Sequence, residues 1–328
     1  MRAIRRILVA IKNPADPTPA SVAKAVQLAK ALKARVELFH SLSAPLMLDS
    51  YTALDGALVE IEAKAAEQAR ERLERMAVPF RRSRVSITTA VEWDYPVHEA
   101  ILRRARQIGA GLIVAERHVG HHNFPGVLKI TDWELLRLSP VPVLLVKTGG
   151  TYAKPALLAA VDPSHSYSKP TGLDRQILQV GALFSRALRG PLHAVHAYVP
   201  FSEPLMETGV IDPGVIQDIA DDAAEKAGKQ MAKALRKSGI PATRQHLVGR
   251  HPTEAIDEIA LQTHSAMVIM GAISRSGLKR FVIGNTAETL LDRLECDLLI
   301  VKPPGFPERV PHAGRGVRLV SFAQVPGL

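Results

Sequence analysis

Short apolar runs alternate along the chain with segments of helical spacing. In the second half, the apolar runs are "ALLAAV", "LHAVHAYV", "ATRQHLV", "AMVIM" and "DLLIV". Between them lie segments whose apolar residues recur every three or four positions, such as "LDRQILQVGALFSRAL" and "GVIQDIADDAAEKAGKQMAKALRK". Runs of this length favour strands, and the spacing favours amphipathic helices. About five strands separated by helices predict an α/β fold: a doubly wound parallel sheet with helices on both faces.

The pattern occurs twice, which indicates a tandem duplication. "TDWELLRLSPVPVLLVK" (131–147) matches "TAETLLDRLECDLLIVK" (286–302), 155 residues further along the chain. Near the start, "ILVAIKNP" (7–14) matches "LLAAVDPS" (157–164) at a spacing of 150 residues. A repeat of this length predicts two domains of the same fold.

The repeat sets the expected domain boundaries. We predict one domain over residues 1–149 and a second over residues 154–304, with a short connection between them. Residues 305–328 contain Pro and Gly at intervals without a clear period. We therefore expect an irregular C-terminal tail there.

Composition narrows the class of protein. Hydrophobic residues make up 47% of the 328 residues and charged residues 23%, the balance of a globular protein. No apolar segment approaches the roughly 18 residues that a membrane span requires, so we expect no membrane partner. The single cysteine, Cys296, excludes a disulfide framework and favours the cytoplasm. The net charge of +10 is scattered over several segments and aromatic residues total only 5%, which argues against nucleic-acid binding.

One loop of the second copy carries the candidate chemistry. In a doubly wound sheet, ligands bind at the carboxyl ends of the strands where the winding reverses. That rule brings Asp162, after the first strand, close to Gly271, at the end of the fourth. The Asp162 carboxylate can accept hydrogen bonds from a ribose or a base, and Gly271 lets a phosphate approach the backbone. A helix starting near Asn285 would point free N–H groups at the same place, with Arg275 adding positive charge.

The loop resembles a family signature. Gly271-x-x-Ser274, nine further residues and Gly284-Asn285 resemble the G-x2-G-x9-G-[S/T] motif of the universal stress proteins. The resemblance covers both copies, and "TDW" (131–133) and "GNTAE" (284–288) are similar to the E-type tandem members. It implies an adenine-nucleotide α-hydrolase-like fold and a cytoplasmic stress-response regulator that binds ATP or a related nucleotide, with any Mg²⁺ carried by that nucleotide. The binding residues that it implies are Ala160, Asp162, Ala197, Gly271, Ser274, Arg275, Gly284, Asn285 and Thr286.

Two departures from the motif keep an alternative open. Ser274 stands where the family has its second glycine, and Asn285 stands where it has Ser or Thr. Asn285-x-x-Glu288 also has the form of a capping box, which would only start a helix. The alternative is a binding module or scaffold for a protein or an apolar ligand that takes no nucleotide.

The first copy departs further from the motif. Glu116 stands at the position of Gly271, Val119 at that of Ser274, and Lys12 at that of Asp162. We therefore expect a degenerate nucleotide site in the first domain, where Lys12 and Glu116 would meet.

The sequence names no catalytic base, so we expect at most slow ATP hydrolysis. An adenylating synthase would need an SGGxDS-like loop after its first strand, and "VDPSHSYS" (161–168) is not one. His118, His121 and His122 lack the spacing of a metal site, and His196 fits a buried core position.

The resemblance also implies how the copies associate. Single-domain members of the family commonly pair through the edge strand that ends each domain. The corresponding segments here are "VPVLLVK" (141–147) and "CDLLIVK" (296–302). We predict intrachain pairing of the two domains through these strands, which leaves room for a homodimer as well.

Overall fold

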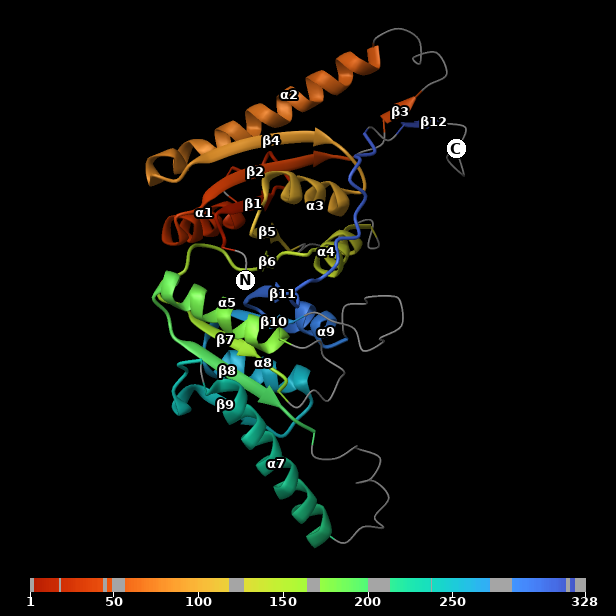
Figure 1. The fold of residues 1–328 in the computed structure, drawn as a ribbon. Coiled ribbons are helices and arrows are strands. Elements are labelled where there is room, and N and C mark those ends of the chain that lie inside the picture. Colours follow the sequence, from red (N-terminus) through yellow and green to blue (C-terminus); the bar gives the residue numbers. More distant parts are fainter. Residues whose placement is uncertain are drawn as a thin grey trace. The chain divides into compact units, whose positions relative to one another are not determined.

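The computed structural model describes residues 3–17, 19–43, 46–48, 57–117, 127–163, 172–199, 213–236, 238–271, 285–316 and 319–321. Within these ranges, only the backbone is described for residues 46–48, 57–58, 127–131, 213, 285–286, 288 and 319–321. The chain forms two compact units: Arg2–Thr151 with Pro307–Leu328, and Tyr152–Phe306. We call them the first and the second unit (Figure 1).

The first unit alternates strands and helices. Its elements are β1 (Arg6–Ala10), α1 (Ala20–Leu32), β2 (Arg35–Leu42), β3 (Leu46–Leu48), α2 (Ala57–Ala77), the 3₁₀ helix η1 (Val78–Ser83), β4 (Ile87–Trp93), α3 (Val97–Ile108), β5 (Leu112–Glu116), α4 (Val127–Leu138), β6 (Val143–Val146) and β12 (Leu319–Ser321).

The second unit repeats this order. Its elements are β7 (Ala156–Ala160), α5 (Leu173–Leu188), β8 (Leu192–Ala197), α7 (Pro213–Leu235), the 3₁₀ turn η2 (Ala242–Arg244), β9 (Gln245–Val248), α8 (Pro252–Gln262), β10 (Ser265–Gly271), α9 (Asn285–Arg293) and β11 (Asp297–Val301). The run "ATRQHLV" was expected to be a strand throughout; its first three residues form η2 instead, directly after Pro241.

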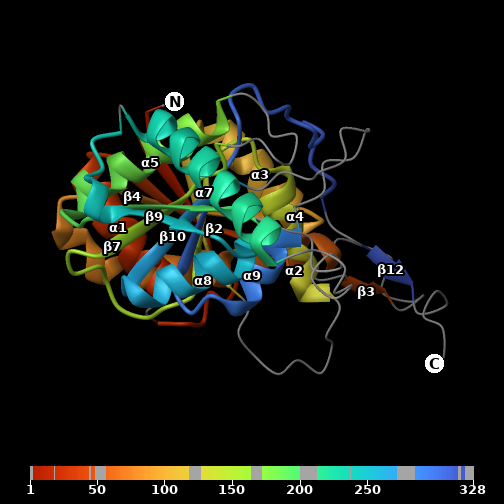
Figure 2. The same ribbon diagram turned by 90° about the horizontal axis from the view of Figure 1, so that it is seen from below.

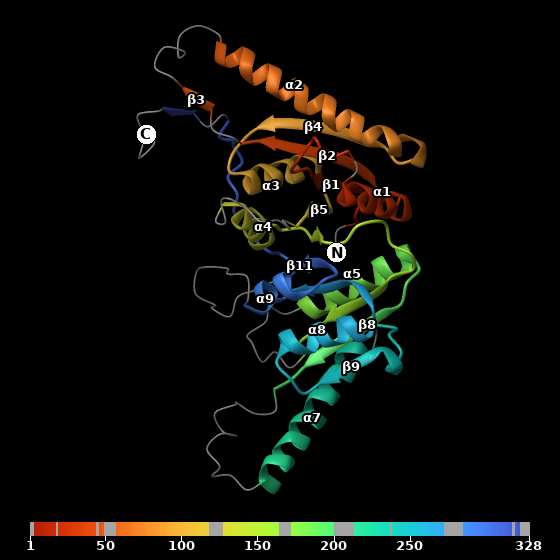
Figure 3. The same ribbon diagram turned by 180° about the vertical axis from the view of Figure 1, so that it is seen from behind.

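Each unit is wound in both directions from a central strand. The strand order is β4-β2-β1-β5-β6 in the first unit and β11-β10-β7-β8-β9 in the second. The neighbouring strands within each unit run parallel. Figure 2 shows α7 and α8 on opposite sides of the second unit's strands, and Figure 3 shows α8 lying against β8. The predicted α/β fold, with two doubly wound parallel-sheet units, is confirmed.

The central strands are buried on both faces. Ile7, Leu8 and Val9 of β1 are fully buried, although consecutive side chains of a strand point to opposite faces. Leu157 and Leu158 of β7 are likewise fully buried. This continuous apolar character is what a parallel sheet covered by helices requires.

A histidine near the end of the second strand marks the duplication. His40 of β2 contacts the Ile11 carbonyl oxygen through Nδ1 at 2.8 Å. His196 of β8, which is fully buried, contacts the Val161 carbonyl oxygen in the same way at 3.3 Å. The sequence expectation of a core position for His196 is therefore confirmed.

The C-terminal tail is not wholly irregular. Leu319–Ser321 forms β12, which pairs in parallel with β3 of the first unit. The sequence did not predict this strand, because the segment has no clear hydrophobic period and its partner strand lies far away in the sequence. Within the described residues, none of the helices is both long and apolar enough to span a membrane.

Gly190, between α5 and β8, provides a test of the packing at the start of β7. A Cβ added to Gly190 would lie 1.8 Å from the carbonyl oxygen of Pro155, a backbone atom that has little room to move. We expect Gly190→Ala to lower the free energy of unfolding by about 3 kcal/mol or more, the upper range for overpacking. Urea denaturation measures this change. Gly149→Ala is the matched control because no atom lies within 4 Å of its added Cβ; equal effects of the two variants would contradict the packing.

Candidate functional site

The winding of the second unit reverses at the carboxyl ends of β7 and β10. The two strands are parallel neighbours, with Ile269 paired to Ala159. From β7 the chain turns outward to β8 on one side, whereas β10 lies on the other side. The connections therefore diverge at this point, which we call the switch point of the unit. Doubly wound sheets bind ligands there.

Four of the predicted site residues lie at this edge of the second unit. Ala160 ends β7, Asp162 follows it by two residues, Ala197 ends β8 and Gly271 ends β10. Asn285 and Thr286 begin α9, but their side chains lie outside the described residues. Ser274, Arg275 and Gly284 also lie outside them, so the contacts expected of these residues stay predictions.

Asp174 holds the turn that carries Asp162. The backbone N–H of Asp162 donates a hydrogen bond to Oδ1 of Asp174 at 3.0 Å. Asp174 lies in the first turn of α5, where a carboxylate is stabilised by the helix dipole. The Asp162 side chain is partly exposed. Sequence reasoning missed Asp174; its only signal was an acidic residue in the first turn of the "LDRQ" helix.

Gly271 has a packing role that the motif did not reveal. A Cβ added to Gly271 would lie 2.5 Å from Cδ2 of Leu173, the first residue of α5. Leu173 is almost completely buried. The absence of a side chain at Gly271 therefore lets α5 pack against the end of β10. A glycine at this position fits tight helix packing as well as the predicted approach of a phosphate.

In the first unit, Glu116 places a carboxylate at the start of α1. Oε1 of Glu116 accepts a hydrogen bond from the backbone N–H of Ser21 at 3.0 Å. Ser21 is the second residue of α1, so the carboxylate lies among the free N–H groups of that helix. An anion is stabilised there by the helix dipole. The chain itself thus supplies an anion at the switch point of the first unit.

Lys12 interacts with two carboxylates of the first unit, Asp132 and Glu116. Burial lowers the pKa of Lys12, and attraction to Asp132 and Glu116 opposes that shift. Burial raises the pKa of Asp132 to about 6, against the opposing attraction of Lys12 and Arg117. Lys12 and Glu116 therefore interact electrostatically, as the sequence predicted. The counterpart of Asp132, Ala287, is uncharged in the second copy.

Among the described residues, no group of three or more His, Cys, Asp or Glu side chains is arranged to hold a metal ion. His118, His121 and His122 lie outside the described residues.

Comparison with known proteins identifies related chains. The model of the universal stress protein family matches residues 3–147 and, a second time, residues 158–302. Universal stress protein E of Escherichia coli (strain K12) is 28% identical over 321 residues, covering 93% of this chain and 96% of the relative. The universal stress protein E homolog of Haemophilus influenzae is 26% identical over 320 residues, covering 91% of this chain and 97% of the relative.

Solved structures share the fold. A functionally unknown protein from Pseudomonas aeruginosa PAO1 has a TM-score of 0.67 at 24% identity, with 92% of this chain and 93% of that chain covered. A universal stress protein from Archaeoglobus fulgidus DSM 4304 has a TM-score of 0.57 at 13% identity, with 91% and 98% covered. Both similarities extend over the two units.

Asp132 predicts a pH dependence of stability. Its pKa of about 6 in the folded chain lies above the ordinary value of 3.8, so the folded chain binds the proton more tightly than the unfolded chain does. The stabilisation is complete below about pH 4 and is lost as the pH rises through about 6. We expect the free energy of unfolding, relative to an Asp132→Asn variant, to fall by up to about 2–3 kcal/mol between pH 4 and 7.

Urea denaturation of both proteins across this pH range measures the difference. The histidines titrate in both proteins, so their contribution cancels in the comparison. A difference that does not change with pH would show that the Asp132 carboxyl has an ordinary pKa.

Proposed function

The chain belongs to the universal stress protein family as a tandem, E-type-like member, and from this membership we propose that its second unit binds ATP or a related nucleotide. The role that we propose is regulatory, in a stress response, rather than metabolic. The only cysteine of the sequence, Cys296, is buried, and one cysteine cannot form a disulfide within the chain, which supports a cytoplasmic location as part of the proposal.

The observation that carries the proposal is the position of Asp162, two residues after the end of β7, and of Gly271, at the end of the neighbouring strand β10. Asp162 would accept hydrogen bonds from the ribose or base, beside the ends of β7 and β8 at Ala160 and Ala197. The N-terminus of α9 at Asn285 would face the phosphates.

Further phosphate contacts in the proposal come from the motif residues between β10 and α9. These residues are Ser274, Arg275, Gly284 and Thr286. Any Mg²⁺ would be bound through the nucleotide's phosphates. No residue is assigned as a catalytic base, so slow hydrolysis is the most that the proposal includes.

The proposal assigns the nucleotide to the second unit because the two switch points differ in charge. In the first unit, the Glu116 carboxylate already accepts a hydrogen bond at the start of α1. A phosphate brought to that place would meet a like charge in a partly buried environment, which is unfavourable. At the matching position of the second unit, Gly271 brings no charge.

Leu173 supports a second candidate function. It fills the space beside Gly271 with an apolar side chain, so the glycine is explained by packing alone and does not require a phosphate. The alternative is a non-nucleotide binding module or scaffold for a protein or an apolar ligand. Nucleotide titration separates the two, because only the first candidate predicts saturable ATP binding.

Isothermal titration with ATP and Mg²⁺ should give one site per chain. Asp162→Ala should weaken binding by about tenfold or more, because a hydrogen bond to a charged group is lost. Lys12→Ala, at the matching position of the first copy, is the control and should leave the affinity unchanged. Two equal sites, no binding, or equal losses in both variants would each overturn the proposal.

A further inference from the structure

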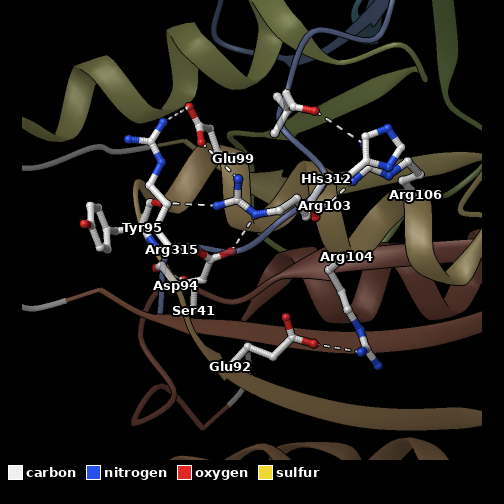
Figure 4. Close-up of polar contacts among 11 residues, drawn as sticks. Ser41, Glu92, Asp94, Tyr95, Glu99, Arg103, Arg104, Arg106, His312 and Arg315 are labelled. Atoms are coloured by element: carbon white, nitrogen blue, oxygen red, sulfur yellow. Dashed lines mark hydrogen bonds and ion pairs between the residues drawn. The ribbon is translucent and has the colours of Figure 1, made fainter. Parts of the chain in front are cut away.

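The segment that follows the second unit lies on the first unit. Residues 307–316, which we call the C-terminal strap, belong to the first unit by their contacts. The strap passes along α3 from its C-terminal end, at Arg106, to its N-terminal end, at Glu99 (Figures 1 and 4). It ends shortly before β12 pairs with β3.

The surface under the strap is built without it. Arg103 donates hydrogen bonds through Nε to Oδ2 of Asp94 at 2.7 Å and through Nη1 to Oε2 of Glu99 at 3.0 Å. Ser41 Oγ donates to the Asp94 carbonyl oxygen at 2.8 Å, and the Tyr95 N–H donates to Oδ1 of Asp94 at 2.9 Å. Asp94 and Arg103 are both buried. These groups lie in β2 and α3 or directly follow β4, so the folded unit orients them in advance.

This surface suits a second guanidinium. Asp94 and Glu99 carry two negative charges against the one positive charge of Arg103, which leaves one acidic charge for an incoming cation. The strap supplies Arg315. Its guanidinium donates through Nη2 to Oε1 of Glu99 at 3.2 Å, and its backbone N–H donates to Oδ1 of Asp94 at 2.8 Å. Its Cζ lies 5.9 Å from the centre of the Tyr95 ring, within the range of a cation–π contact.

Arg106 holds the other end of the strap through one side chain and two backbone carbonyl groups. Arg106 donates through Nη1 to Oε1 of Glu308 at 3.1 Å and to the Val310 carbonyl oxygen at 3.4 Å. It also donates through Nη2 to the His312 carbonyl oxygen at 3.5 Å. The two carbonyl contacts recognise an extended chain, whereas the ion pair recognises the Glu308 side chain.

Most of the strap is exposed to solvent. Of residues 307–316, only Val310 is buried, and the others are exposed. Ion pairs between exposed groups contribute little, so the burial of Val310, the polar contacts at both ends and the pairing of β12 with β3 hold the segment in place. A surface that is arranged in advance and covered by an exposed, extended segment is the arrangement of a peptide-docking site.

The second unit lacks this surface. At the same spacing of 155 residues, Gly249 stands for Asp94, Arg250 for Tyr95 and Glu258 for Arg103. Arg250 and Glu258 form an ion pair with each other at 3.1 Å. Only Glu254, the counterpart of Glu99, keeps its residue type. The surface is therefore a property of the first unit alone.

We propose that Asp94, Tyr95 and Glu99 form a docking site for an extended, arginine-containing peptide segment, and that the C-terminal strap is its resident occupant. The strap exchanges between docked and released states. A partner protein that presents an arginine on an extended segment competes with it. The site does not depend on nucleotide binding by the second unit.

A peptide supplied in trans tests the proposal in the full chain. The receptor is a strap-released variant, Val310→Asp with Arg315→Ala, whose changes lie only in the strap. The probe is a fluorescent peptide of residues 307–316, measured by fluorescence anisotropy. A tethered segment has an effective concentration on the order of millimolar, so the wild-type strap should exclude the peptide. We expect the peptide to bind the variant at least about tenfold more tightly than it binds the wild type.

Two controls locate the binding. A peptide carrying Arg315→Ala should bind the strap-released variant at least about tenfold more weakly, since it loses a charge-assisted hydrogen bond and a cation–π contact. Adding Glu99→Gln to the receptor should weaken binding, whereas Glu254→Gln, at the matching position of the second unit, should not. Circular dichroism checks that each receptor is folded. The peptide with Arg315→Ala needs no change in the receptor surface.

The other results would overturn the proposal. A peptide that binds neither protein shows that the surface is no docking site. Equal binding to both proteins shows that the strap does not occupy the surface in solution. Equal binding of the peptides with and without Arg315→Ala shows that arginine is not recognised.

Discussion

The rest of the structure depends on one constraint: in each unit, the central strand pairs in parallel with the strand that follows the third described α-helix of that unit. β1 pairs with β5, and β7 pairs with β10, in parallel. Parallel strands need crossover helices on both faces, which explains why consecutive residues of β1 and β7 are buried. The same pairing brings Lys12 close to Glu116, and Asp162 close to Gly271, although the two residues of each pair lie more than 100 positions apart in the sequence. The candidate chemistry of both units is therefore located by the topology.

The two units share a fold but carry different charges at the ends of their strands. In the first unit, Glu116 binds the start of α1 and interacts with Lys12, so the chain's own charges meet at the switch point. In the second unit, Gly271 brings no charge, and the turn after β7 is held by Asp174 from the side. The first unit carries instead a surface around Asp94 that the strap covers. The duplication has kept the fold while the two copies have acquired different surfaces.

The sequence predicted the elements that local patterns encode. The apolar runs, the helical spacing and the repeat sufficed for the α/β fold and its duplication. Contacts between distant residues were out of reach: nothing near Gly271 indicates that Leu173 packs on it. Residues 305–328 were expected to be irregular because Pro and Gly recur there without a clear period. No sequence pattern indicates that Arg315 contacts Asp94, 221 residues away, because the donor is a backbone N–H. The intrachain strand pairing and the phosphate contacts of Ser274, Arg275 and Gly284 remain predictions.

We propose that the same fold provides a nucleotide site in the second unit, whereas in the first unit the Glu116 carboxylate occupies the equivalent place. A crystal structure of the full chain grown with saturating ATP and Mg²⁺ tests it most directly. The account predicts electron density for one nucleotide per chain, between the ends of β7 and β10, with Glu116 still bonded to the Ser21 N–H. Density for a nucleotide beside Glu116, or none at Asp162 and Gly271, would contradict the account.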